Sequence, residues 1–229
     1  ATDGSVTLDG ALATYTPDTN YSGSDSFIFT VSDGLETSEA IVTLDISAVN
    51  DAPVLASVSD VSFDEDGSGS ASLSAIDVDG DDLTYSISEG TDITATLTGS
   101  DISFGAPDNF NGSETFTVSA SDNEYVDSQT IRVIVNAVND APVADAISEV
   151  TEEDQSVVIS LSGSDVDGDN LSFSVDSASN GSIILDASFA TYTPNANYSG
   201  SDSFIFTVSD GLETSEAIVT LDISAVNDA

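Results

Sequence analysis

The chain of 229 residues has no cysteine, histidine, methionine or tryptophan, and Arg132 is its single basic residue. Without cysteine it forms no disulfide. Without His, Cys and Lys it has no Ser-His or Cys-His dyad, no Schiff-base lysine and no ordinary zinc or iron site. Nucleic acid is disfavoured as a partner, because neutralising phosphates requires Lys and Arg. No apolar run reaches the roughly 18 residues of a membrane span, and no secretion signal is visible.

Acidic residues dominate the charge: 42 Asp and Glu give a formal net charge of −41. This charge also disfavours binding to an anionic membrane surface. Hydrophobic residues still make up 39% of the chain and recur in short runs, which is enough for packed cores rather than disorder. Aspartate outnumbers glutamate, 31 to 11, and Asp favours turns over helix and strand interiors. The composition therefore predicts an all-β chain with its acids in the loops.

Internal repetition is the strongest pattern in the sequence. Residues 21–52 return unchanged at 198–229, a shift of 177, and a diverged copy lies between them at a shift of about 88. The phrase VNDAPV at 49–54 and 138–143 separates the copies. We divide the chain into the C-terminal half of a truncated repeat (1–52, the half-repeat) and two complete repeats (53–141 and 142–229). We expect an excerpt of a longer array, whose half-repeat exposes strand edges and risks aggregation.

Apolar residues alternate with Ser and Thr in a pattern typical of strands. The predicted strands centre on residues 73–75, 83–87, 116–120 and 131–135 in the first complete repeat, and on 157–161, 171–175 and 217–224 in the second. About seven short strands per repeat predict tandem immunoglobulin- or cadherin-like β-sandwiches arranged end to end. Residues 204–208 (FIFTV) are apolar on both faces, which predicts a central strand. Phe and Tyr are predicted to be core residues.

The motif DVDGD at 77–81 and 165–169 spaces carboxylates two residues apart around a glycine. Ca²⁺ takes six to eight oxygen ligands, and such a turn supplies several from one side. Gly80 and Gly168 allow the turn. The terminal Glu of an EF-hand loop is missing, so other segments must complete the cage. The alternative is that these aspartates only cap turns or solvate an acidic surface.

Further acids recur at the spacing of the repeat, after the F-x-V strand, in the linkers and in an early strand. The candidate ligands are Asn50, Asp51, Asp77, Asp79 and Asp122 at the first junction (residues 49–53), and Glu65, Asn139, Asp140, Asp165, Asp167 and Asp210 at the second junction (residues 138–142). Asn227 and Asp228 repeat the linker pair at the end of the chain. Because only the second junction follows a complete repeat that supplies a glutamate, we expect it to be the better-formed cation site.

The phrases VNDAPV, DVDGDxL and YTPxxNYSGSDSFxFTVSDG resemble the cadherin-like and immunoglobulin-like tandem repeats of giant bacterial surface adhesins, including RTX-type adhesins. The resemblance covers essentially the whole chain. It implies an extracellular protein with Ca²⁺ at each junction. It also implies that Glu65 is the base glutamate and that the DxD pairs and Asp122 or Asp210 are top-loop ligands. The linker is shorter than in cadherins, and their DRE motif has no clean counterpart.

Three functions fit these features to different degrees. A calcium-stiffened extender of a surface adhesin or filament, with a role in cell attachment or biofilm, suits near-identical copies without pocket chemistry. A calcium-assisted carbohydrate-binding module would need exposed aromatic residues. An enzyme would have only paired carboxylates, as in glycoside hydrolysis, and no pair stands out among 42 acids. We predict the extender and no enzymatic activity. Its partners would be neighbouring repeats, and lateral self-association is compatible with the sequence.

Overall fold

The structure is a computed structural model that describes residues 1–227. Within that range the chain forms strands joined by turns and no helix, so no described segment is a membrane-spanning helix. Backbone contacts divide the chain into two compact units. The first comprises Ala1–Phe63, Gly67–Pro107 and Gly112–Val135, and the second comprises Asp64–Asp66, Asp108–Asn111 and the chain from Asn136 onward. The loops around Glu65 and the second linker therefore belong to the same unit as the second complete repeat.

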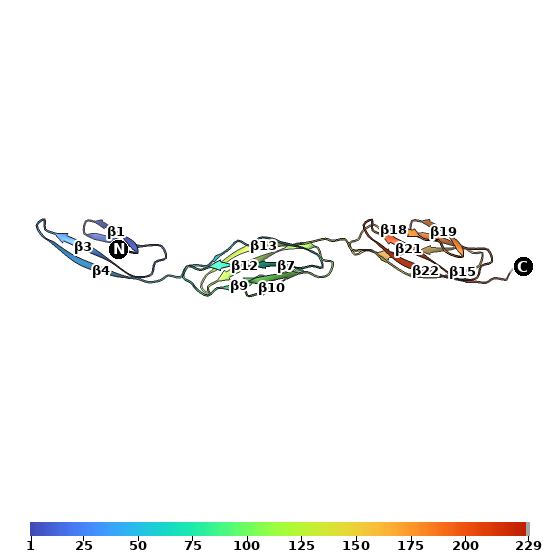
Figure 1. The fold of residues 1–229 in the computed structure, drawn as a ribbon, viewed down its shortest axis with the longest axis horizontal. Coiled ribbons are helices and arrows are strands. Elements are labelled where there is room, and N and C mark those ends of the chain that lie inside the picture. Colours follow the sequence, from blue (N-terminus) through green and yellow to red (C-terminus); the bar gives the residue numbers. More distant parts are fainter. Residues whose placement is uncertain (228–229) are drawn as a thin grey trace. The chain divides into compact units, whose positions relative to one another are not determined.

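The second complete repeat is a two-sheet sandwich (Figure 1). One sheet has the order β15 (Ile147–Glu152), β22 (Thr214–Ser224), β21 (Gly200–Ser209) and β18 (Ser172–Val175); the other has the order β16 (Val157–Ser160), β20 (Phe189–Pro194) and β19 (Gly181–Asp186). β15 runs parallel to β22, and the other pairs within these sheets are antiparallel. A short pair, β14 (Val143–Ala144) and β17 (Gly163–Ser164), completes the repeat.

The first complete repeat has the same arrangement. Its sheets are β6 (Val61–Asp64), β13 (Val126–Asn136), β12 (Gly112–Ser121) and β9 (Thr84–Ile87), then β10 (Thr94–Thr98), β11 (Asp101–Gly105) and β7 (Gly69–Ser72), with the pair β5 (Val54–Leu55) and β8 (Ala75–Ile76). The half-repeat has two hairpins, β1 (Gly4–Asp9) with β2 (Leu12–Pro17) and β3 (Gly23–Ser32) with β4 (Thr37–Ile46). The tandem β-sandwich class predicted from the sequence is confirmed.

Each complete repeat has nine strand segments rather than the seven expected. The first two strands are each broken, into β14 and β15 and into β16 and β17 in the second complete repeat. Leu73 and Leu161, predicted to lie within strands, fall at these breaks but remain buried, at 4% and 3% exposure. Both side chains are buried although the backbone at these positions belongs to no strand. The hydrophobic pattern of the sequence therefore continues through each break in the strand.

The core of the second complete repeat lies between its two sheets. Phe204, Phe206 and Val208 of β21 pack with Ala190 and Tyr192 of β20 in one buried cluster. β21 lies between β22 and β18, as the FIFTV run predicted. The other face of β21 is not covered, however, as the 40% exposure of the Ile205 side chain shows. The strand is central because it pairs on both edges, and not because both of its faces are buried.

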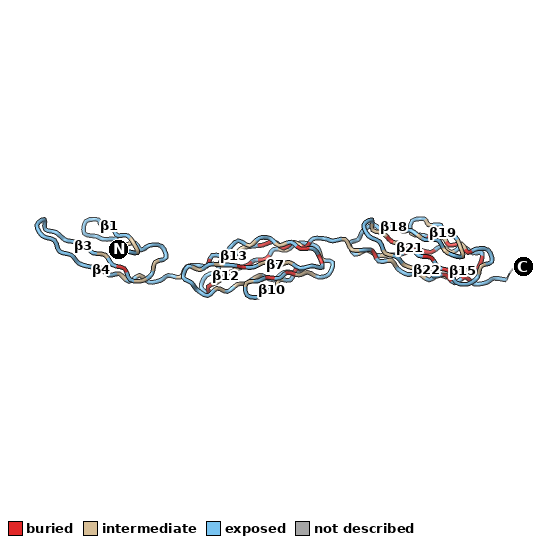
Figure 2. The backbone as a smooth tube through the Cα atoms, in the orientation of Figure 1, coloured by how far each residue is buried: buried red, intermediate tan, exposed pale blue. Residues whose placement is uncertain are grey.

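The half-repeat shows what the same sequence does without the rest of the sandwich. Phe29 and Phe206 occupy equivalent positions in an identical stretch, yet Phe29 is 45% exposed and Phe206 is fully buried. Val31 is 60% exposed and Val208 is fully buried. Figure 2 shows this difference as a pale blue β3–β4 hairpin and a β21 with buried segments. The half-repeat was predicted to expose its strand edges. It also exposes the side chains that form the core in the second complete repeat.

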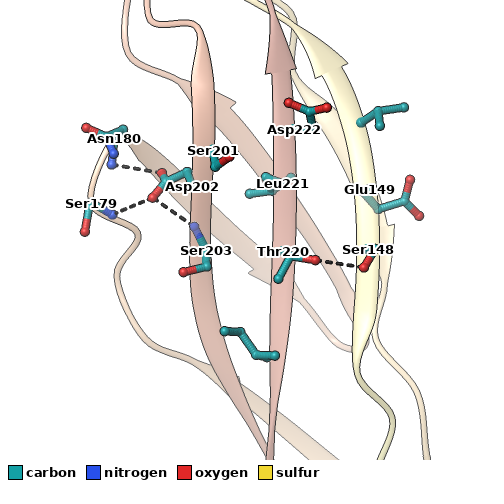
Figure 3. Close-up of a pocket in the computed structure, with 12 residues that line it drawn as sticks. Ser148, Glu149, Ser179, Asn180, Ser201, Asp202, Ser203, Thr220, Leu221 and Asp222 are labelled. Carbon is teal, nitrogen blue, oxygen red and sulfur yellow. Dashed lines mark hydrogen bonds between the residues drawn. The ribbon is translucent and has the colours of Figure 1, made fainter.

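A buried carboxylate, Asp202, joins the two sheets of the second complete repeat, and Figure 3 shows its hydrogen bonds with Ser179, Asn180 and Ser203. Asp202 of β21 accepts hydrogen bonds from the Tyr192 hydroxyl of β20 at 2.8 Å and from the Asn180 and Ser203 N–H groups, both at 2.9 Å. Burial alone would raise the pKa of Asp202, but these hydrogen bonds outweigh it and lower the pKa. In the first complete repeat Glu114 binds the N–H groups of the matching loop, and Phe104 replaces the tyrosine.

Replacing Asp202 with Asn should lower the stability of the second complete repeat by about 1–2 kcal/mol at pH 7, because it removes a charged acceptor from buried donors. A lowered folded-state pKa stabilises above the unfolded-state pKa, near 3.9, and this stabilisation is lost as pH falls through the folded-state pKa. Urea unfolding of D202N and of the exposed control D186N should therefore show a deficit for D202N at pH 7 that shrinks below pH 4. An equal deficit at both pH values would contradict the charged hydrogen bonds.

Candidate cation sites at the two junctions

The DVDGD motif of the second complete repeat folds into a tight turn. The Asp165 Oδ1 atom accepts hydrogen bonds from the N–H groups of Asp167 at 3.0 Å and Asp169 at 3.2 Å. Gly168 has φ +80°, a conformation that favours glycine, as the sequence indicated. The aspartate does cap a turn, as the alternative interpretation required. Capping the turn uses only the Oδ1 atom of Asp165. Its other carboxylate oxygen, Oδ2, is buried without a hydrogen-bond partner.

The first complete repeat has the same turn. Asp77 Oδ1 accepts from the N–H groups of Asp79 at 2.9 Å and Gly80 at 3.1 Å, and Gly80 has φ +81°. Asp77 Oδ2 is again buried and unpartnered. A buried carboxylate oxygen without a donor is unfavourable unless something else compensates it. Two independent copies of the motif thus leave the same oxygen available for a ligand.

The structure also adds a third aspartate to each motif. Carboxylate oxygens of Asp165, Asp167 and Asp169 lie within 4.8 Å of one another, and so do those of Asp77, Asp79 and Asp81. The candidate ligands chosen from the sequence included only the first two of each set. The third was visible in the DVDGD motif, and its spacing of two residues was the signal that should have included it.

The second linker is fastened to these loops. The Asp140 N–H donates to Asp167 Oδ2 at 2.8 Å, and Asn139 Nδ2 donates to Asp210 Oδ2 at 2.9 Å. The Val138 N–H donates to Glu65 Oε1 at 2.5 Å. These contacts bring Glu65, Asp167 and Asp210 to the linker that contains Asn139 and Asp140, and Asp165 lies in the same turn as Asp167.

Glu65 is the most buried acid of this set, at 6% exposure. One of its oxygens is held by Val138, and the other, Oε2, is buried without a partner. It thus repeats the pattern of Asp165, with one oxygen in a backbone hydrogen bond and one unpaired. Glu153, its equivalent in the second complete repeat, accepts from the Val226 N–H at 2.6 Å. Asn227 follows directly, and Asp228 lies outside the described residues.

The first junction repeats the linker contacts without a glutamate. The Asp51 N–H donates to Asp79 Oδ2 at 2.7 Å, and Asn50 Nδ2 donates to Asp122 Oδ2 at 2.9 Å. The half-repeat has no residue equivalent to Glu65. The two junctions thus share one arrangement and differ in this single buried carboxylate.

The electrostatics of the second junction are those of crowded anions. Burial raises the pKa of Asp140, and the charges of Asp167, Asp66, Glu65 and Asp165 raise it further. Asp66 was not among the sequence candidates. A raised folded-state pKa means that stability is lost as pH rises through it, because the charged form is disfavoured in the folded state. A bound cation would remove this repulsion.

Asp210 and Asp122 are in the opposite situation. The Asn139 side chain and the Glu213 N–H hold the pKa of Asp210 below its usual range, and the Tyr125 N–H and Asn50 side chain do the same for Asp122. Both carboxylates are therefore anionic near neutral pH. They position the linker asparagines by hydrogen bonds and add negative charge to the site.

A shallow cavity of about 340 Å³ opens beside the second linker and is lined by Asn111, Asn139, Asp167 and Asp169, with Ala137 and Val138. Every polar side chain on it is a carboxylate or an amide. Such oxygen donors suit hard cations such as Ca²⁺ rather than zinc or copper. The unpaired oxygens of Glu65 and Asp165 make the residues present compatible with a divalent ion.

A family model described as "Bacterial Ig domain" matches residues 1–45, 50–134 and 139–222. The second crystal form of human protocadherin-24 EC1-2 has a TM-score of 0.51 at 21% identity, over 79% of this chain and 100% of that chain. Drosophila N-cadherin EC1-4 has a TM-score of 0.39 at 13% identity, over 97% and 65%.

The endo-fucoidan hydrolase MfFcnA4 has a TM-score of 0.34 at 19% identity; the match covers 99% of this chain and 38% of that enzyme. Comparison with curated proteins finds no significant match. The cadherin likeness supports the sandwich fold. The family match extends over nearly all of the chain, and this chain therefore belongs to the bacterial Ig domain family.

Proposed function

We propose that the chain is a calcium-stiffened extender segment of an extracellular bacterial adhesin or surface filament, with a role in attachment or biofilm. Domains of the bacterial Ig and cadherin-like kinds are usually extracellular or at the cell surface. The observation that supports the calcium role is the pair of acidic clusters at the linkers, with buried and unpartnered oxygens on Asp77, Asp165 and Glu65.

Calcium would act on the joint because its ligands come from three segments. At the second junction Glu65 comes from the loop after β6 of the first complete repeat, Asp140 lies in the linker and Asp165 lies in the second complete repeat. An ion held by all three would restrain the linker, and without it the carboxylates repel one another. The hydrophobic cores involve none of these groups. Ion removal should therefore free the joints while the sandwiches stay folded.

Small-angle scattering of the full chain with calcium and with chelator tests this role. We expect a serial arrangement of sandwiches rather than a sphere. We also expect chelator to broaden the distribution of maximum dimensions while far-UV circular dichroism is nearly unchanged. Magnesium at equal ionic strength controls for screening. Identical scattering with and without calcium would contradict a stiffening role.

Carbohydrate binding is the other function considered from the sequence. Most aromatic side chains of the complete repeats are buried or half-buried, and Tyr192, Phe104, Phe116 and Phe206 are each at most 1% exposed. Tyr125 and Phe189 are exposed, at 44% and 52%. They lie in different repeats, and within its own complete repeat each is the one aromatic side chain more than 40% exposed. A glycan array with and without calcium separates this function from the extender, which should give no calcium-dependent signal.

A further inference from the structure

We propose that the outer face of the β16–β20–β19 sheet is a self-association surface, at which the second complete repeat meets the same face of a second copy of the chain. This inference does not depend on calcium binding at the junctions.

Three large apolar side chains point outward from this sheet. Val158 of β16 is 61% exposed, Ile184 of β19 is 72% exposed and Phe189 of β20 is 52% exposed. Val158 and Ile184 are both cross-strand partners of Thr191 in β20. Phe189 lies two residues before Thr191 in β20 and therefore on the same face of the sheet. The three therefore form one patch. Contiguous exposed apolar side chains often mark an interaction site, whereas scattered ones do not.

The fold does not require this patch. At a shift of 88 residues the equivalent positions in the first complete repeat are Ser70, Thr96 and Asp101. They occupy the same rows of the β7–β11–β10 sheet, since Ser70 and Thr96 are both partners of Ser103, and Asp101 pairs with Ser72. The first complete repeat thus forms the same sandwich with a polar outer face. This type of sandwich therefore does not need apolar side chains at these three positions.

Charge indicates which partner fits. In a chain of net charge −41, Asp186 is the one acid among the outward residues of β16, β20 and β19, and the remainder beside the patch are Ser and Thr. The opposite outer face also has exposed apolar residues, Ile205, Ile218 and Val150, but Glu216 and Asp222 lie on it. Two copies meeting there would oppose carboxylates, which is unfavourable. Meeting through the nearly neutral face reduces this repulsion to that between the two copies of Asp186.

The size of the face sets the strength of the association. Three strands about 4.8 Å apart, with four residues in β16 and six each in β19 and β20, cover roughly 250 Å². A stable interface needs about 800 Å² per partner. We therefore expect a weak dimer, populated only at high protein concentration and favoured by salt, which screens the net charge. An isologous contact closes on itself and stops at two copies.

Sedimentation equilibrium of the full chain from micromolar to millimolar concentration in 0.5 M salt measures this association. The test variant V158S/I184T/F189D installs the residues of the first complete repeat, which that sandwich already tolerates. The matched control, I205T/I218T, installs Thr117 and Thr130 of the first complete repeat on the opposite face. Circular dichroism and thermal melting verify that both variants are folded. Backbone NMR shifts on dilution locate the contact.

The wild type and the I205T/I218T control should dimerise equally, and the triple variant should associate at least about tenfold more weakly. Dilution shifts should concentrate on the Val158, Thr191 and Ile184 amides. A wild type that stays monomeric at millimolar concentration would overturn the proposal. So would a triple variant that associates like the wild type, or dilution shifts on a second, different face. If I205T/I218T alone abolishes association, the opposite face is the interface.

Discussion

Replacing Phe206 with Ala should lower the unfolding free energy of the second complete repeat by about 3–5 kcal/mol, whereas Phe29→Ala should lower that of the half-repeat by less than about 1 kcal/mol. The two phenylalanines lie in an identical stretch of 32 residues. Phe206 is fully buried between two sheets, and Phe29 is 45% exposed on a hairpin. Truncation therefore leaves a cavity in one place and removes half-solvated surface in the other.

This comparison keeps local sequence constant, so any difference in effect comes from tertiary packing. Amide hydrogen exchange followed by NMR measures both segments in one chain, and slow exchange should be lost selectively in β21 and β22 of F206A. Equal losses in the two variants would mean that the half-repeat has a packed core, against its exposure here. Each variant also serves as the other's control for secondary effects on the remaining repeats.

Replacing Asp165 and Asp167 together with Asn should abolish most of the calcium-dependent stabilisation of the second complete repeat. Calcium at 100 times its dissociation constant stabilises a wild-type site by about 2.7 kcal/mol, and the variant should lose most of that. Asn retains an oxygen acceptor for the Asp140 N–H but removes two charges. Without calcium the variant should be as stable as the wild type or more stable, because less repulsion acts on Asp140.

Differential scanning calorimetry with calcium and with chelator measures both quantities. The matched control D77N/D79N carries the same change at the first junction, and it should spare the calcium response of the second complete repeat. Wild-type calcium affinity in D165N/D167N would show that the motif is only a turn. It would leave the buried oxygen of Asp165 without an explanation.

The periodicity of the sequence was enough to predict the fold, because each apolar stripe is buried on one face of a sheet. The strand breaks at Leu73 and Leu161 could not be predicted in this way, since both side chains stay buried where backbone pairing is interrupted. The exposure of the outer face of β21 could not be predicted for a related reason. The apolar side chain of Ile205 is compatible with burial, but the sequence does not show whether another element covers it.

The candidate site followed from the spacing of acids, and the structure brings the predicted residues of each junction together. Asp81 and Asp169 were omitted although the motif contains them. Asp66 recurs as Asp154 at the spacing of the repeat, but its effect on Asp140 depends on how the loop at Asp64–Asp66 approaches the linker. The unpaired oxygens of Glu65, Asp77 and Asp165 also could not be read from sequence, since they depend on which backbone N–H groups each carboxylate meets.

A calcium titration of the full chain by isothermal calorimetry, in the wild type and in E65Q, tests the junction sites most directly. We expect saturable binding in at least two classes, with the tighter class weakened about tenfold or more in E65Q and the weaker class unchanged, because only the second junction contains that glutamate. The equivalent variant E153Q should not alter the tighter class. Absence of saturable binding at millimolar calcium, or identical titrations of wild type and E65Q, would contradict the assignment of these acids to a cation.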